Sequence, residues 1–151
     1  MPKIVRLDQI GGPENLKIID APVPDPGPGE AKIRVHAVGL NRAELVFIAG
    51  HYLEPTVPPT RIGYEAAGVV EAVGPDVDQS WVGKRIATVP GFSMKQYGLL
   101  GEAAVVPAHN LVETPADQSD IEAAASWMQY CTAYGALIHI AHVKPDRKSV
   151  V

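Results

Sequence analysis

Two polar side chains, Tyr64 and Glu65, stand together in the most chemically suggestive part of this sequence. Gly63 and Gly68 enclose them, and an apolar run follows directly. A carboxylate can pair with a cation or accept hydrogen bonds from backbone amides. A phenol stays protonated at neutral pH and offers a metal ion no imidazole-like lone pair. The pair therefore favours hydrogen bonding and packing over metal binding.

Few other side chains are arranged for metal or redox chemistry. His139 and His142 lie three residues apart without a third His, Cys or carboxylate at ligand spacing, so we expect them at a helix end, where His suits the helix dipole. Cys131 is the only cysteine, which excludes an intrachain disulfide and a multi-cysteine zinc site. We expect it to be a small buried hydrophobic residue.

Asn41 precedes a short helical pattern at residues 43–48, which Gly50 ends. Its side-chain oxygen can accept a free amide of the first turn, which predicts a helix beginning here. The amide nitrogen remains free to donate to the oxygen of a bound molecule. Both roles stay open for Asn41.

Most of the chain up to residue 107 has the alternating pattern of short β-strands. Residues 3–10 and 16–19 alternate around a glycine-rich turn, which predicts a hairpin, and four prolines at every second position make residues 21–29 an extended loop. Residues 30–40 form a long expected strand, which places His36 on its solvent side. Further strands are expected at residues 66–73, 85–89 and 102–107. Many short strands joined by glycine turns indicate a barrel.

The pattern changes after residue 118. Residues 119–122 (SDIE) form a capping box before an alanine-rich helix, and residues 129–141 carry a second helical stretch that ends before Pro145. Residues 148–151 then look like the start of an apolar strand. This change predicts the truncated beginning of an α/β domain.

Composition describes an ordinary protein with one independent core. The 151 residues are 46% hydrophobic and carry a formal net charge of -4. Phosphate binding needs clustered Lys and Arg, so the scattered charges argue against a nucleic-acid partner. No apolar run approaches the length of a membrane span and no signal-like stretch opens the chain, so we expect a cytoplasmic protein without a membrane partner.

Four segments in this order resemble the medium-chain dehydrogenase/reductase superfamily, in its zinc-free, zeta-crystallin-like quinone oxidoreductase branch. They are residues 11–16 (GGPENL), 40–44 (LNRAE), 63–68 (GYEAAG) and 127–134 (WMQYCTAY). The resemblance implies a mainly β fold with some α: a GroES-like β-barrel catalytic domain at residues 1–115, then interdomain helices and the first strand of an incomplete Rossmann domain at residues 116–151. The dinucleotide fingerprint and the segment that returns to complete the barrel are absent.

The resemblance also implies the residues that would carry chemistry. Asn41 matches a position lining the cleft between nicotinamide and substrate, and Tyr52 matches an aromatic hydroxyl over the substrate pocket. Met128 and Thr132 match positions that contact the nicotinamide, and Arg42, which follows Asn41 in the same turn, is expected to contact the cofactor. We therefore expect Asn41 and Tyr52 to be catalytic, and Asn41, Arg42, Met128 and Thr132 to bind the cofactor.

Each of these assignments has a structural alternative. Tyr52 could pack at a loop edge, and Met128 could fill the core. Thr132 could hydrogen-bond to its own helix, while Arg42 could form a surface ion pair with Glu44.

Tyr64 stands where zinc alcohol dehydrogenases have a His ligand. We expect Tyr64 to fill space in an apolar cleft and no zinc to bind. We expect Glu65 to be structural, either paired with a cation or capping a backbone turn.

The resulting hypothesis is the N-terminal catalytic part of a zinc-independent, NADPH-dependent quinone or enone oxidoreductase. NADPH is implied by the resemblance alone. The whole protein is expected to be a homodimer, and this chain by itself to be inactive. Two alternatives remain: a noncatalytic GroES-like binding module, and an inactive fragment that pairs through exposed apolar helix faces.

Overall fold

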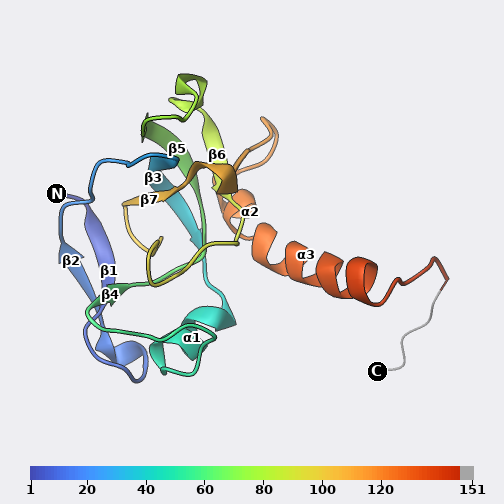
Figure 1. The fold of residues 1–151 in the computed structure, drawn as a ribbon, viewed down its shortest axis with the longest axis horizontal. Helices are drawn as coiled ribbons and strands as arrows, with labels where there is room; N and C mark the ends of the chain where they lie inside the picture. Colours follow the sequence, from blue (N-terminus) through green and yellow to red (C-terminus); the bar gives the residue numbers. More distant parts are fainter. Residues whose placement is uncertain (147–151) are drawn as a thin grey trace.

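The computed structural model describes residues 1–146, and the expected strand at residues 148–151 lies outside them. Two antiparallel sheets form the body of the molecule, and a helical arm extends from it (Figure 1). Beside the strands and helices named below, single turns of 3-10 helix occupy Pro13–Asn15, Gln79–Trp81 and Ala108–Asn110.

The smaller sheet contains the predicted opening hairpin. Strands β1 (Lys3–Leu7) and β2 (Leu16–Asp20) pair antiparallel, with Leu7 opposite Leu16 next to the turn. Strand β4 (Thr60–Arg61) pairs with the other edge of β1 and completes the order β2-β1-β4. This two-residue strand is absent from the sequence-based expectation, because two residues carry no periodic signal.

The larger sheet has the order β7-β3-β5-β6-β8. Its strands are β3 (Glu30–Gly39), β5 (Glu65–Val73), β6 (Arg85–Thr88), β7 (Ala103–Pro107) and β8 (Leu111–Glu113). The alternation of β3 is as expected, with Ile33 fully buried and Arg34 and His36 exposed. Strand β8 was not predicted.

The mainly β class is confirmed, but the sheets are not closed into a barrel. The five-stranded sheet has β7 at one edge and β8 at the other, and these two strands do not pair with each other. An isolated bridge between Ile4 of β1 and Gly101 links the smaller sheet to the segment that leads into β7. Closure requires an unbroken ring of paired strands, and the pairing among the described residues stops short of one.

The two largest apolar clusters form most of the core. The larger one lies over the five-stranded sheet, where Ile33, Ala66, Ile86 and Ala104 are fully buried. The second lies between helix α1 (Arg42–Ile48) and the three-stranded sheet and includes Phe47. This second cluster includes Tyr64, the residue before β5, whereas Ala66 in β5 belongs to the first cluster. The start of β5 therefore contacts both clusters.

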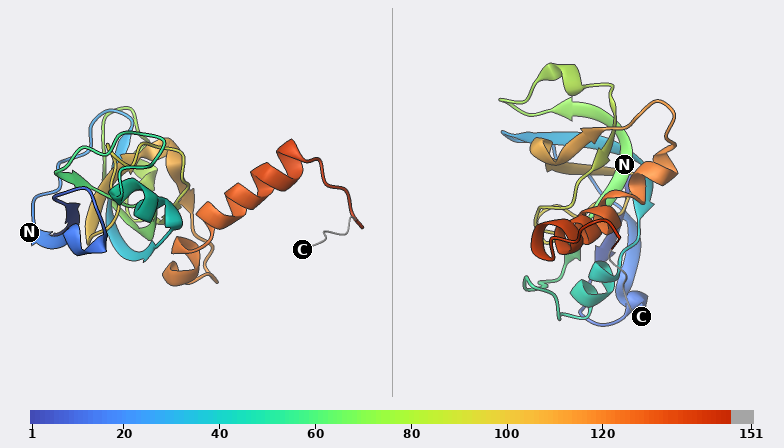
Figure 2. Two further views of the ribbon diagram at one scale, coloured as in Figure 1. Left: turned by 90° about the horizontal axis from the view of Figure 1, so that it is seen from below. Right: turned by 90° about the vertical axis from the view of Figure 1, so that its right-hand side faces the viewer.

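Helix α2 (Asp120–Ala124) packs on the larger sheet and begins at the predicted capping box, in which the Ser119 hydroxyl accepts the Glu122 N–H at 3.2 Å. Helix α3 (Trp127–Tyr134) then continues as a π-helical stretch (Gly135–Ile140) and runs away from the body (Figures 1 and 2). Cys131 lies exposed on this arm. The expectation of a buried cysteine is therefore wrong, because within residues 1–146 most of the arm packs against no other element.

Candidate functional site

Asn41 lies where strand β3 ends and helix α1 begins. It is the N-cap residue of α1, as the sequence predicted, and forms a capping box with Glu44. One Glu44 carboxylate oxygen accepts the Asn41 main-chain N–H at 2.7 Å. The Asn41 side-chain nitrogen is turned the other way and donates to Glu65 Oε2 at 3.2 Å. Glu44 of α1 thus holds the backbone of Asn41, and Glu65 of β5 holds its side-chain amide.

Glu44 is buried, with 5% of its surface exposed. Its second carboxylate oxygen accepts the main-chain N–H of Tyr64 at 3.2 Å, which ties α1 to the entry of β5. Burial raises the pKa of the Glu44 carboxyl, and the accepted backbone N–H groups act in the opposite direction. The proposed surface ion pair with Arg42 is wrong, because Glu44 points inward and its oxygens bind backbone amides.

Glu65 opens strand β5 and is fully buried. Besides Asn41, it accepts the main-chain N–H of Met128 at 3.0 Å, in the first turn of α3. Of the two roles expected for Glu65, capping backbone groups is the one present. A carboxylate at a helix N-terminus also suits the positive end of the helix dipole. Glu65 therefore joins Asn41 on the sheet side to the start of the helical arm.

A row of aromatic rings passes through Tyr64, the residue before Glu65. Its five rings, in order of contact, have centroids 6.1, 6.0, 5.6 and 6.0 Å apart, and they belong to Phe47, Tyr52, Tyr64, Phe92 and Tyr97. Tyr64 is 7% exposed and fills an apolar space, as expected. Burial, followed by the neighbouring Tyr52 hydroxyl, raises the pKa of Tyr64, so its hydroxyl stays protonated at neutral pH. Half-buried Tyr52 and Met128 both pack on the cluster that contains Tyr64.

The structure therefore gathers three of the expected site residues and leaves two outside. Asn41, Tyr52 and Met128 lie around Glu65 and Tyr64. Thr132 is exposed and its hydroxyl donates to the Met128 carbonyl at 2.7 Å, which is the bond within its own helix considered above. Arg42 is exposed at the edge of a cavity.

That cavity lies beside Asn41 and has a volume of about 440 Å³. Its walls come from α1, the hairpin and the segment before β7, and are mostly apolar. They are formed by Pro13, Leu16, Leu40, Asn41, Arg42, Glu44, Leu45, Ile48, Ile62 and Leu100. A molecule seated here would contact the helix that orients Asn41.

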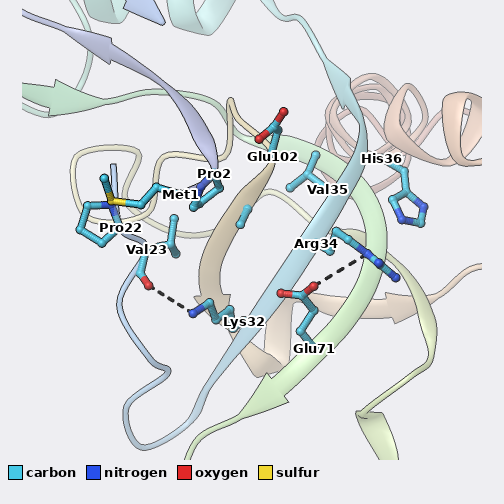
Figure 3. Close-up of a pocket in the computed structure, with 11 residues that line it drawn as sticks. Met1, Pro2, Pro22, Val23, Lys32, Arg34, Val35, His36, Glu71 and Glu102 are labelled. Atoms are coloured by element: carbon cyan, nitrogen blue, oxygen red, sulfur yellow. Dashed lines mark hydrogen bonds and ion pairs between the residues drawn. The ribbon is translucent and has the colours of Figure 1, made fainter. Parts of the chain in front are cut away.

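Other hollows lie farther from this cluster. One, of about 700 Å³, follows the exposed side of α3. Another, of about 650 Å³, lies on β3 near the N-terminus (Figure 3). Its cations are already engaged: Lys32 donates to the Val23 carbonyl at 3.2 Å, and Arg34 lies 3.8 Å from Glu71 (Figure 3). Neither hollow contains the residues that the sequence singled out around Asn41.

Glu44 and Phe92 are the site residues that sequence reasoning missed. Glu44 follows Asn41 by three residues, which is the spacing of a capping box and could have identified its inward direction. Phe92 lies in an irregular segment between β6 and β7, where no local pattern indicates which side chains face the site.

Within residues 1–146, no three His, Cys, Asp or Glu side chains are grouped so that they could hold a metal ion. In the same residues, no helix is both long and apolar enough to cross a membrane.

Comparison with known proteins shows which family of domains this fold resembles. Residues 27–116 match the alcohol dehydrogenase GroES-like domain. The match covers the five-stranded sheet, helix α1 and the site residues Asn41, Tyr52, Tyr64 and Glu65, and ends before Met128.

Individual relatives extend the similarity over nearly the whole chain. A quinone oxidoreductase from Pongo abelii is 37% identical over 150 residues, covering 99% of this chain and 44% of the relative. The solved structure of human synaptic vesicle membrane protein VAT-1 homolog-like protein is 33% identical with a TM-score of 0.86, over 95% of this chain and 45% of that one. Escherichia coli quinone oxidoreductase, solved as a complex with NADPH, is 28% identical with a TM-score of 0.84, over 96% of this chain and 43% of that one.

The chain belongs to the medium-chain dehydrogenase/reductase superfamily, in its quinone oxidoreductase branch, and corresponds to the N-terminal part of such a protein. It spans less than half the length of the quinone oxidoreductase relative that it matches.

Proposed function

We propose that this chain is the catalytic part of an NADPH-dependent oxidoreductase that reduces quinones or activated alkenes without zinc. In this proposal residues 1–115 form the catalytic domain, and residues 116–151 lead into a cofactor domain of a longer protein that dimerises. The observation that carries the proposal is the meeting of Asn41, Tyr52 and Met128 around buried Glu65 and Tyr64. Similarity to a quinone oxidoreductase and to an NADPH complex supports the substrate and the cofactor.

The residues around Tyr64 fit a nicotinamide ring better than a zinc ion. Zinc in proteins takes thiolate, imidazole and carboxylate ligands. Here the phenol of Tyr64 is kept protonated, and both Glu65 oxygens already accept N–H groups. A nicotinamide needs apolar surface and a few amide partners, which half-buried Met128, half-buried Tyr52 and the second N–H of Asn41 supply.

Bound NADPH would supply a hydride, and the chain's own residues would prepare the acceptor. Asn41 would donate its remaining amide N–H to the substrate oxygen and stabilise the negative charge that grows there. The Tyr52 hydroxyl would orient the acceptor from the loop side. Thr132 lies outside the gathered residues but one helical turn from Met128, and its hydroxyl oxygen, which still has a free lone pair, would help to seat the nicotinamide. The aromatic row would exclude water, which strengthens each of these hydrogen bonds. Water or a pocket hydroxyl would supply the proton.

The test is NADPH oxidation with a simple quinone, using the longest natural form of the protein. We expect turnover without added zinc, undiminished by a chelator, and a loss of about 10²-fold in kcat for Asn41→Ala. Asn15→Ala is the matched control, because Asn15 lies in the hairpin turn. Absence of NADPH-dependent turnover, or an equal loss in both variants, would refute the proposal.

One observation favours a second candidate, pairing of this chain through the helical arm. Apolar residues of the arm are widely exposed, including Tyr130 at 72% and Ile140 at 79%. Exposed apolar patches of this kind mark protein contacts. Sedimentation of the 151-residue chain over a range of concentrations tests this, and a monomer at all concentrations contradicts it.

A further inference from the structure

Glu65 is a buried carboxylate that the proposed chemistry does not use directly. Its side chain is fully buried, and no ion pair among residues 1–146 includes it. A charge in such a place is costly unless hydrogen bonds compensate for lost water. Its two oxygens make those bonds to groups 24 and 63 residues away in the sequence.

The bond to Asn41 selects one orientation of the side-chain amide. An ionised carboxylate can only accept hydrogen bonds, whereas an amide has a donating and an accepting end. With Glu65 Oε2 at 3.2 Å, the nitrogen of Asn41 must face it. The second N–H on that nitrogen then stays available to an acceptor in the cleft.

The bond to Met128 fixes the start of the arm. Met128 lies in the first turn of α3, where backbone N–H groups have no partner within the helix. Glu65 Oε1 accepts this N–H at 3.0 Å, so the same carboxylate sets the position of α3 and the orientation of Asn41.

The neighbouring backbone leaves room for this carboxylate. A Cβ added at Gly39 would lie 2.5 Å from Glu65 Oε2 and 2.2 Å from the carbonyl oxygen of Ala124. Only a residue without a side chain allows β3, Glu65 and the end of α2 to approach so closely.

We propose that Glu65 is a positioning residue: it holds the Asn41 amide with its nitrogen toward the carboxylate and clamps the first turn of α3, so that the two sides of the cleft keep one geometry. This inference rests on the proposed function for its effect on rate. Its structural part, that Glu65 fixes the Asn41 amide and the first turn of α3, does not depend on activity.

Glu65→Gln tests both halves. The Gln oxygen can still accept the Met128 N–H, but its NH₂ group would face the nitrogen of Asn41, so Asn41 must turn over and present oxygen. We expect kcat for quinone reduction by the longest natural form to fall about 10²-fold, with little change in the KM for NADPH. Glu71→Gln, the same exchange at an exposed position of β5, should leave the rate unchanged.

A double mutant separates positioning from general damage. If Glu65 acts through Asn41, Glu65→Gln should cost little further activity once Asn41 is Ala. Full additivity of the two losses would overturn the proposal.

Nuclear magnetic resonance tests the geometry without turnover. In the unmutated protein the Asn41 side-chain amide hydrogen that is bonded to Glu65 and the Met128 amide hydrogen should exchange slowly with water. In Glu65→Gln the Asn41 signals should shift, while Met128 stays protected. Exchange of the Asn41 side chain at the rate of a free amide in the unmutated protein would overturn the proposal, even if the variant failed to fold. If the longest form reduced no quinone, the proposed function would fail, and this measurement alone would decide the role of Glu65.

Discussion

Replacing each of the two buried glutamates around Asn41 by glutamine should have unequal effects on stability. Glu44 accepts two main-chain N–H groups, from Asn41 at 2.7 Å and Tyr64 at 3.2 Å. Glutamine has one oxygen, so its NH₂ group must face one of these N–H groups, and neither can turn. At Glu65 one of the two donors is a side-chain amide, which can rotate to offer its oxygen.

The expected loss of unfolding free energy comes from one backbone N–H group left without an acceptor. Leaving a buried N–H without a partner costs about 1–3 kcal/mol. Burial raises the pKa of Glu44, so removing its charge relieves part of a desolvation penalty and lowers the net cost. We expect Glu44→Gln to lose about 1–2 kcal/mol of unfolding free energy and Glu65→Gln to lose less than about 1 kcal/mol.

Urea unfolding followed by circular dichroism measures both values, with Glu71→Gln as an exposed control. Each kcal/mol also lowers Tm by about 2–4 °C for a chain of this size. A Glu44→Gln change within about 0.5 kcal/mol of zero, the range of ordinary surface substitutions, would refute the reasoning. A larger loss for Glu65→Gln would refute it equally.

The stability contributed by Glu44 should also depend on pH. Because the pKa of Glu44 is raised on folding, the folded protein holds this proton more tightly than the unfolded chain does. Stability from this group therefore falls as pH rises from the ordinary carboxyl range through the raised pKa. Glu44→Gln should flatten that part of the profile.

Two further predictions concern the supports of the site. Asp120→Asn should destabilise α2, because Arg85 holds the pKa of the Asp120 carboxyl low. We expect the substitution to remove about 0.5–1 kcal/mol of unfolding free energy. This contribution is present above the ordinary carboxyl pKa and is lost as pH falls through the lowered pKa. Faster amide exchange in α2 would show it, and an equal effect from Asp25→Asn, whose side chain is 98% exposed, would contradict it. Thr88→Val should cost about 1–3 kcal/mol by leaving the buried Ala66 N–H, now 2.9 Å from the Thr88 hydroxyl, without an acceptor. Thr88→Ser keeps the hydroxyl and should cost less in the same urea assay, so the reverse order would count against this bond.

Local signals predicted the elements well where the relevant bonds are local. The hairpin around residues 11–15, the helix that follows Asn41 and the capping box at Ser119 are all present. In each, the pattern and the bonds that satisfy it lie within a few residues. Strand β4 was missed because two residues show no period. The predicted barrel is not closed among the described residues, because closure depends on pairing between distant edges.

Some residues of the candidate site could likewise be identified from the sequence, and others could not. Asn41, Tyr52 and Met128 could be selected from the sequence through resemblance to a family. The partner that joins Asn41 to Met128 could not be selected, since Glu65 has no local feature that specifies residue 128. Inward-facing Glu44 was missed for a different reason: its capping-box spacing was present in the sequence and was not used.

The sequence by itself determined the β-rich class and the starts of α1 and α2, because periodicity, caps and turns are short-range properties of neighbouring residues. It also indicated the family, through resemblance in four short segments. Only the tertiary structure decided that Glu44 and Glu65 are both buried and that they hold opposite sides of Asn41. A buried charge must find its hydrogen bonds wherever the fold brings donors to it, and those donors come from segments far apart in the chain.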